Sequence, residues 1–528
     1  MDHPLLKRSA HATREATAEA PPEDRAATAP GGRLGRAKVI GLVAGATVFT
    51  VMLLAPTPSD LSVAGWRTAA AAMLMAVWWM TEAIPISATA LLPLILFPVL
   101  GIAPIDDAAA PYAEPIIFLF MGGFMIALAM ERWELHRRIA LNIIRAIGTR
   151  PHSIVLGFIV ASAFLSLWIS NTATTLMMLP IGLSVVDVAR RSGSGAADDA
   201  GAGGFGNFAV CLMLGIAYAA NIGGIGTLIG TPTNALLAGF MRDTYGVEIS
   251  FLQWMLVGLP VVVLGLPVMY LALTRLVYPV RMRALPGGRE YIDGELARLG
   301  GITKPELMVA GVFALVAALW IARPLLSGWI PGASDAGIAM FGALLLFILP
   351  VHASQGVFLM NWKHAERLPW GVLILFGGGL TLAGTIQETG LAEWLGGFLT
   401  VAGGLPVILI IAIAATLILF LTELTSNSAT AAAFMPIMVA LAVAVGQNPL
   451  LLATAVTIAA SCAFMLPVAT PPNAIVYGSG LLTIPQMARA GLVLNVLFVF
   501  LVTALTYTVA AYIFGIELGV LPEWATPS

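Results

Sequence analysis

The chain has 528 residues, of which 59% are hydrophobic and 10% are charged, and its formal net charge is −2. This composition excludes an ordinary soluble globular protein, and the absence of a basic excess gives no support to nucleic-acid binding. Long uncharged stretches such as Leu424 to Ala488 indicate instead a polytopic, all-α membrane protein.

The chain begins with residues 1–37, which are rich in Ala, Pro and charge and are predicted to form a disordered cytoplasmic tail. Apolar runs of roughly 17–25 residues then predict eleven transmembrane helices. Residues 281–303 are predicted as a cytoplasmic loop and residues 516–528 as an external tail. The predicted spans are 39–55, 64–81, 84–102, 114–131, 207–240, 252–280, 305–323, 334–351, 369–387, 450–482 and 488–515.

Two further apolar blocks, 153–189 and 404–446, each carry a Ser-Asn motif near the middle, Ser170-Asn171-Thr172 and Ser426-Asn427-Ser428. Each block is long enough for two half-length helices. We therefore expect both to be re-entrant hairpins that enter and leave on the same side of the membrane.

Basic residues set the expected orientation. They gather in the N-terminal tail, between Arg132 and Arg150, and between Arg281 and Lys304. These segments fall on one side of the eleven-span arrangement, which the positive-inside rule makes cytoplasmic. The N-terminus is thus predicted to be cytoplasmic and the C-terminus external. The membrane itself is expected to be a bacterial inner membrane.

The two motifs belong to an internal repeat. Several neighbours recur at the same offset of 256, including Gly122 with Gly378 and Pro180 with Pro436. Further on, residues 230–234 correspond to 469–473 at an offset of 239, and a glycine-rich insertion within 190–206 accounts for the difference. The fourth and ninth predicted spans run in opposite directions, so the repeats are inverted, an architecture typical of secondary transporters.

The hairpin tips suit a cation and an anion together. Ser166 and Ser170 are four residues apart, as are Thr422 and Ser426, so on a helix each pair would share one face. A tip frees carbonyls at the end of one helix and amides at the start of the next. Carbonyls, an Asn oxygen and hydroxyls suit Na⁺, whereas amides, Asn NH₂ and hydroxyls suit a carboxylate.

Two proline-containing segments, Gly230-Thr231-Pro232 and Ala469-Thr470-Pro471, are predicted as unwound breaks in the fifth and tenth spans. No Lys or Arg lies in the tips or the breaks. A multiply charged anion would then depend on dipoles, hydroxyls and co-bound cations, which favours cation coupling.

Other interpretations compete with a transport site. Ser and Thr in membrane helices often bond only to backbone, but duplication with matched Pro breaks outweighs that reading. Glu423 is predicted to have an interfacial structural role rather than a place in a proton relay. An enzyme is not expected, because no nucleophile with a base and no metal cluster lies near the motifs; an ion channel is the remaining alternative from another class.

The twin Ser-Asn motifs, together with residues 465–474, Met-Leu-Pro-Val-Ala-Thr-Pro-Pro-Asn-Ala, resemble the divalent anion/sodium symporter family of INDY-like di- and tricarboxylate transporters over residues 38–515. The resemblance implies a homodimer whose transport domain moves like an elevator against a scaffold. Residues 38–150 and 304–400 would form the scaffold and connecting arms, and 151–280 and 401–515 the two halves of the transport domain.

The resemblance also implies site residues, with two or more Na⁺ ions per protomer and no organic cofactor. One Na⁺ site would use Ser166, Ser170, Asn171 and the carbonyl of Gly230. The second would use Thr422, Ser426, Asn427 and the carbonyl of Ala469. The substrate anion would meet Asn171, Thr172, Thr231, Pro232, Asn427, Ser428, Thr470 and Pro471.

Ser428 departs from the Thr that is common in this family, and Pro232-Thr233 replaces a Pro-Pro pair. The expected function is Na⁺-coupled symport of C4-dicarboxylates such as succinate, malate and fumarate, which the retention of both Ser/Thr-x-x-x-Ser-Asn patterns favours. The alternatives are Na⁺-independent exchange of dicarboxylates or 2-oxoglutarate, and citrate or sulfate transport within the same family.

Overall fold

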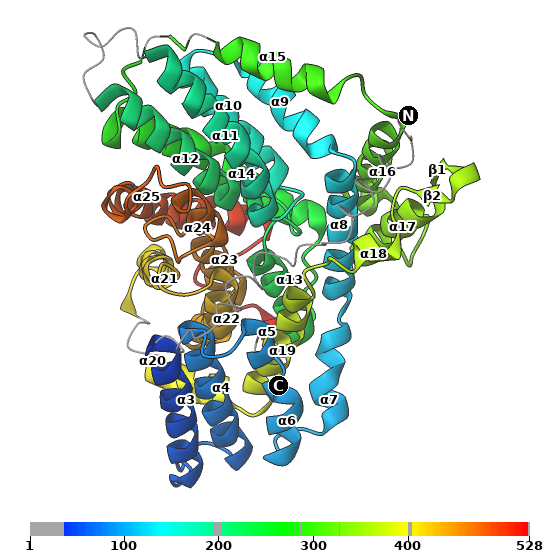
Figure 1. Ribbon diagram of the computed structural model, residues 1–528. Coiled ribbons are helices and arrows are strands. Elements are labelled where there is room, and N and C mark those ends of the chain that lie inside the picture. Colours follow the sequence, from blue (N-terminus) through cyan, green and yellow to red (C-terminus); the bar gives the residue numbers. More distant parts are fainter. Residues whose placement is uncertain are drawn as a thin grey trace, which may run out of the picture.

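The computed structural model describes residues 36–193, 203–282, 284–285, 287–326, 328–399 and 404–525, and these residues are predominantly helical (Figure 1). The expected disordered tail lies outside the described residues except for its last two positions, which already belong to the first helix. The first half contains α3 Arg36–Leu54, α4 Val63–Thr81, α5 Ile86–Thr89, α6 Leu92–Val99, α7 Ile105–Ala109, α8 Pro115–Arg132, α9 Leu135–Ile147, α10 Pro151–Ser166, α11 Asn171–Gly193, α12 Gly203–Gly224, α13 Pro232–Tyr245 and α14 Phe251–Leu271.

The second half contains a short sheet as well as helices. A short antiparallel pair, β1 Pro350–His352 and β2 Val357–Phe358, follows α17, so the fold is not wholly helical. The helices are α15 Gly288–Leu299, α16 Lys304–Leu326, α17 Asp335–Ile348, α18 Trp362–Ala365, α19 Trp370–Glu388, α20 Leu391–Leu399, α21 Val407–Leu421, α22 Asn427–Ala444, α23 Pro449–Ala460, α24 Pro471–Tyr477, α25 Ile484–Leu505 and α26 Ala511–Ile513.

Eight helices in the described part of the chain are long and apolar enough to cross a membrane. Two of them are the second arms of the predicted hairpins, α11 with 23 residues and α22 with 18. The expectation of half-length helices is therefore wrong for these arms, whereas the first arms, α10 and α21, have 16 and 15 residues. The count of eleven spans and the re-entrant path of the hairpins stay predictions.

The predicted span 84–102 is not one helix. It is divided into α5, which ends at Thr89, and α6, which begins at Leu92. Pro93 lacks the N–H that would donate to the carbonyl of Thr89, so a continuous helix would lose a hydrogen bond there. The predicted spans 207–240 and 450–482 are also divided, as expected, around the two Pro-containing segments.

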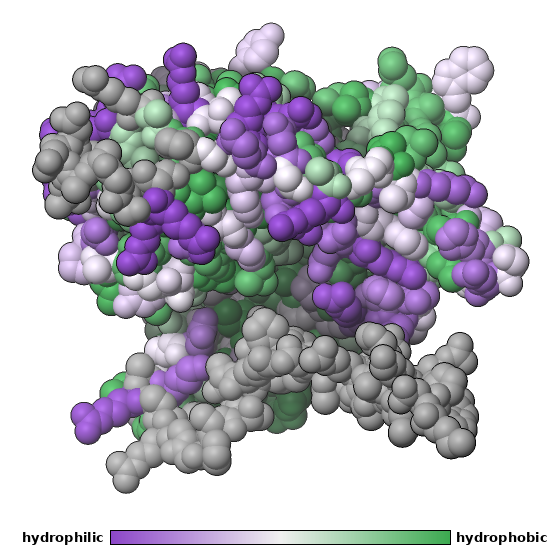
Figure 2. Space-filling model, turned by 45° about the horizontal axis from the view of Figure 1, so that its top comes forward, coloured by the Kyte–Doolittle hydropathy of each residue, from purple (hydrophilic) through white to green (hydrophobic). Residues whose placement is uncertain are grey.

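The predicted loop 281–303 contains a helix, α15, which lies against α9 (Figure 1). Ion pairs between distant parts of the chain hold it: Arg137 to Glu295 at 2.6 Å and Arg145 to Asp293 at 2.9 Å. Figure 2 brings this end of the molecule forward and shows hydrophilic side chains gathered among hydrophobic ones. Residues 288–299, which composition alone predicts to be loop, are thus held as a helix against α9.

Glycines allow the closest helix contacts. Gly122 of α8 lies so close to α17 that an added Cβ would be 2.6 Å from the carbonyl carbon of Ala339. Its repeat counterpart Gly378 of α19 meets the carbonyl of Ala90 in the same way. Both helices therefore pack through positions that only glycine fits, as small residues do at membrane helix interfaces.

We expect Gly122→Ala to destabilise the protein by about 1–3 kcal/mol, because the new methyl group overlaps backbone that cannot rotate away. The measurement is the thermal unfolding midpoint of purified protein in detergent. Gly311→Ala on α16 is the matched control, since no atom lies within 4 Å of its added Cβ. Equal midpoints for the Gly122 variant and the control would contradict the close packing of α8 on α17.

Candidate functional site

The first Ser-Asn motif forms the connection between α10 and α11. Ser166 is the last residue of α10 and is fully buried, and Asn171 is the first residue of α11. The Ser166 hydroxyl donates to Asn171 Oδ1. Ser170 lies beyond the end of α10, where its Oγ accepts a bond from the amide of Ala173 at 3.2 Å. The expectation that Ser166 and Ser170 share one helical face is wrong, because they lie on opposite sides of the tip.

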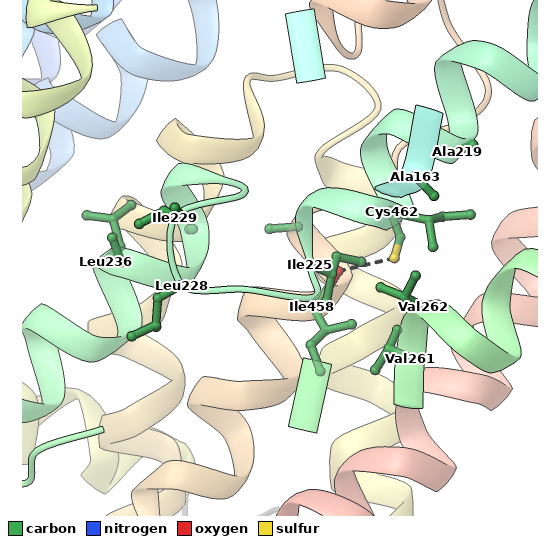
Figure 3. Packing of buried hydrophobic residues seen from close by; sticks show 14 of the residues in the cluster. Ala163, Ala219, Ile225, Leu228, Ile229, Leu236, Val261, Val262, Ile458 and Cys462 are labelled. Carbon is green, nitrogen blue, oxygen red and sulfur yellow. Dashed lines mark hydrogen bonds between the residues drawn. The ribbon is translucent and has the colours of Figure 1, made fainter. Parts of the chain in front are cut away.

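The first break, residues 225–231, separates α12 from α13 and is fixed by Asn234. Asn234 Nδ2 donates to the carbonyls of Gly224 at 3.0 Å and Thr227 at 2.7 Å. It also lies 3.3 Å from the carbonyl of Ile225. Figure 3 shows this break among apolar side chains from neighbouring helices, including Ala163, Val261, Val262 and Ile458. Asn234 therefore bonds the carbonyls that the end of α12 leaves free, and the neighbouring apolar side chains surround them.

Oxygen atoms from the tip and the break converge around two glycines. A Cβ built on Gly230 would contact the carbonyl oxygen of Gly224 and lie 2.9 Å from that of Ser166. A Cβ built on Gly224 would lie 2.6 Å from Asn171 Oδ1 and 3.1 Å from the carbonyl oxygen of Gly230. Neutral oxygens, the ligand type that hard cations prefer, thus lie close together at this point.

The second motif has equivalent contacts at the predicted offsets. The Thr422 hydroxyl, at the end of α21, donates to Asn427 Oδ1 at 2.8 Å, as Ser166 does to Asn171. Ser426 precedes the first residue of α22. Asn473 Nδ2 donates to the carbonyls of Ala463 at 3.3 Å and Leu466 at 3.0 Å, which are the positions equivalent to Gly224 and Thr227. The hydroxyl–asparagine and asparagine–carbonyl contacts are therefore present in both halves, whereas Ala463 and Ala469 stand where the first half has Gly224 and Gly230.

Hydrogen bonds and packing join the two halves. Asn221 of α12 donates to the hydroxyl of Thr470 at 3.1 Å, and the hydroxyls of Thr233 and Ser461 are 2.8 Å apart. The helix after each break packs on the other half's hairpin: α13 on α22, and α24 on α11. Thr231 and Thr470, which precede α13 and α24, are both 3% exposed.

Thr172 and Ser428 are half-buried in the first turns of α11 and α22. Their hydroxyls make no hydrogen bond to any other described residue. Pro232 and Pro471 begin α13 and α24, so the amide they lack is one that a helix start leaves unpaired. Hydroxyls and helix N-termini at these positions are suited to an anion.

Three asparagines of this region are not among the site residues that the sequence predicts. Asn234 and Asn473 stand at the ends of the two matched segments, and their shared offset of 239 is a signal that could have identified them. No such signal exists for Asn221, because its repeat counterpart is Ala460. The predicted interfacial role of Glu423 is wrong, because this residue is only 3% exposed and lies within the protein.

A cavity of about 290 Å³ lies elsewhere, at the ends of α13 and α19. Four carboxylates are part of its lining: Asp107, Glu114, Asp243 and Glu388. None of the motif residues lines it. Its negative charge makes it unsuitable for an anionic substrate.

Known proteins resemble this chain over most of its length. A family model described as the sodium:sulfate symporter transmembrane region matches residues 36–516. The sodium-dependent dicarboxylate transporter SdcS of Staphylococcus saprophyticus is 43% identical over 485 residues, which are 91% of this chain and 93% of that protein. SdcS of Staphylococcus aureus strain USA300 is 44% identical over 486 residues, again 91% and 93%.

Two solved structures are similar at low identity. The YdaH transporter of Alcanivorax borkumensis has a TM-score of 0.51 and 12% identity, covering 91% of this chain and 97% of that one. MtrF of Neisseria gonorrhoeae has a TM-score of 0.53 and 14% identity, covering 91% and 94%. These likenesses concern the fold alone.

Proposed function

The chain belongs to the sodium:sulfate symporter family, the divalent anion/sodium symporters, and on this basis we propose that it is a secondary transporter that couples C4-dicarboxylate uptake to Na⁺. Succinate, malate and fumarate are the proposed substrates. The names of the two SdcS relatives support a dicarboxylate and Na⁺ dependence. The observation that carries the proposal is the hydroxyl–asparagine contact at each tip together with the asparagine–carbonyl contacts at each break, which are present in both halves.

Two Na⁺ ions would be bound, one in each half. Ser166, Ser170, Asn171 and the Gly230 carbonyl are the proposed ligand residues of the first. Thr422, Ser426, Asn427 and the Ala469 carbonyl are those of the second. The hydroxyl–asparagine bonds hold each Asn oxygen beside its break, where an incoming cation would compete for it.

The dicarboxylate would lie between the two tips. Its carboxylates would be met by Asn171 and Thr172 from the first half, and by Asn427 and Ser428 from the second. Thr231 and Thr470 would add hydroxyls, with Pro232 and Pro471 lining the site. Because these residues are all uncharged, two bound Na⁺ ions would balance a divalent anion, and substrate and cation binding would depend on each other.

Movement would follow the elevator mechanism. The hairpins with α12, α13, α14, α23, α24 and α25 would form the moving part within 151–280 and 401–515. The helices of 38–150 and 304–400 would form the scaffold of a homodimer in the bacterial inner membrane, with the N-terminus cytoplasmic and the C-terminus external. The contacts of α13 with α22 and of α24 with α11 support a transport unit that moves as one body.

Binding titrations of the purified protein test substrate and coupling together. We expect succinate to bind in Na⁺ and to lose most of its affinity when choline replaces Na⁺, whereas citrate and sulfate bind more weakly. Uptake into vesicles under the same ion conditions is the second measurement. Uptake that ignores Na⁺ but requires internal dicarboxylate would identify an exchanger and overturn the symport proposal.

A further inference from the structure

Glu423 is a buried carboxylate that connects the second hairpin tip to the second break. Its oxygens accept hydrogen bonds from the backbone amides of Phe464 at 2.7 Å, Met465 at 2.9 Å and Leu466 at 3.2 Å. Asn495 of α25 donates a further bond at 2.8 Å. Three consecutive amides of the break are therefore held by one side chain that follows Thr422 directly.

These partners are all donors, so both carboxylate oxygens act as acceptors, which is the arrangement that suits the ionised form. Within the described residues, no Lys, Arg or His lies within ion-pair distance of Glu423. The side chain is thus surrounded by donors that stabilise a negative charge inside the protein, with amide dipoles as its partners. A buried charge of this kind favours a nearby cation strongly, because the surrounding dielectric is low.

The first half has no such charge. Its equivalent of Glu423 is Leu167, whose backbone carbonyl accepts a bond from the Thr227 hydroxyl. The equivalents of Phe464 and Met465 are Ile225 and Gly226, whose amides bond to backbone carbonyls of the preceding helix. The two breaks therefore share the carbonyl contacts of Asn234 and Asn473, but differ in what holds their amides.

We propose that Glu423 is a positioning residue for the second cation site and makes that site the tighter of the two. It acts through the break: its bonds fix residues 464–466 by their amides while Asn473 fixes the carbonyls of Ala463 and Leu466. Its charge lowers the energy of a cation beside Thr422 and Asn427. The second site would then fill before the first. This inference rests on the Na⁺ sites of the proposed function.

The test uses Na⁺-dependent thermal stabilisation of the full-length protein without substrate. Glu423→Gln keeps the size of the side chain and removes its charge, and we expect it to raise the Na⁺ concentration for half-maximal stabilisation by about tenfold or more. Asn495→Ala removes one donor but keeps the charge, so we expect a shift below about threefold. Glu517→Gln, the same substitution at an exposed position, is the control and should match the wild type.

Equal shifts for the Glu423 and Asn495 variants would assign Glu423 a purely structural role and overturn the inference, as would an unshifted Glu423→Gln. A wild-type protein that Na⁺ does not stabilise would instead remove the proposed Na⁺ coupling, and this inference with it. If Glu423→Gln does not fold, hydrogen–deuterium exchange of the wild type decides. Half-maximal protection of 461–470 should then occur at lower Na⁺ than that of 222–231, and the reverse order would contradict the proposal.

Discussion

Alanine in place of Asn171 or Asn427 is expected to lower Na⁺-driven succinate uptake about a hundredfold or more. Each asparagine would contact both a cation and the substrate, and a hydrogen bond to a charged group is worth about 1.5–3 kcal/mol. Two such contacts exceed the ~2.8 kcal/mol that corresponds to a hundredfold change. Vesicle uptake driven by an inward Na⁺ gradient is the measurement, with protein amounts matched by quantitative blotting.

Asn142→Ala is the matched control for both variants. Asn142 is exposed on α9 and donates only to the carbonyl of Arg138 among the described residues, so its loss should leave uptake near the wild-type rate. Saturable uptake that survives in both Asn171→Ala and Asn427→Ala would remove the two tips from the transport site. Current that does not saturate with substrate would favour a channel.

Gly230→Ala is expected to weaken Na⁺-dependent substrate binding through a different cause. The added methyl group would occupy the space between the carbonyls of Gly224 and Ser166, which the first Na⁺ is proposed to fill. We expect Na⁺-dependent succinate binding to fall by at least about tenfold while the protein stays folded, because a single methyl in a backbone gap typically costs about 1–3 kcal/mol of stability. Isothermal titration of succinate in Na⁺ measures the loss.

Gly332→Ala provides the comparison, since Gly332 lies in a connection where an added Cβ meets no atom within 4 Å. Its binding curve should match the wild type. Normal Na⁺ dependence in Gly230→Ala would show that the gap at Gly230 is not a cation site, even if Asn171 proves essential.

The hairpin tips and the two breaks could be predicted because their signals are local. Pro232 and Pro471 begin α13 and α24, where a missing amide and a fixed φ suit the first turn of a helix. Pro93 gives the same signal at the start of α6, but it lies inside a strongly hydrophobic run that resembles one continuous span. The helix α15 could not be found in this way, because its stability depends on ion pairs to α9, about 150 residues earlier.

Only part of the geometry at the two tips follows from the sequence. The pairing of Ser166 with Asn171 and of Thr422 with Asn427 follows from the tips, but Ser170 does not share a helical face with Ser166, since α10 ends at Ser166. The burial of Glu423 depends on amides 41 to 43 residues away and on Asn495. Contacts over such separations leave no local pattern in a single sequence.

Asn234 and Asn473 would influence the ion selectivity of the proposed Na⁺ sites. Because their amide groups already bond the carbonyls of the two breaks, the main chain there keeps its shape without help from an ion. Little conformational entropy is then lost when a cation enters, so more of the interaction energy is available to replace its hydration shell. Main chain that keeps its shape would also discriminate between ions by their radius. Asn234 and Asn473 would thereby disfavour K⁺, which is larger than Na⁺.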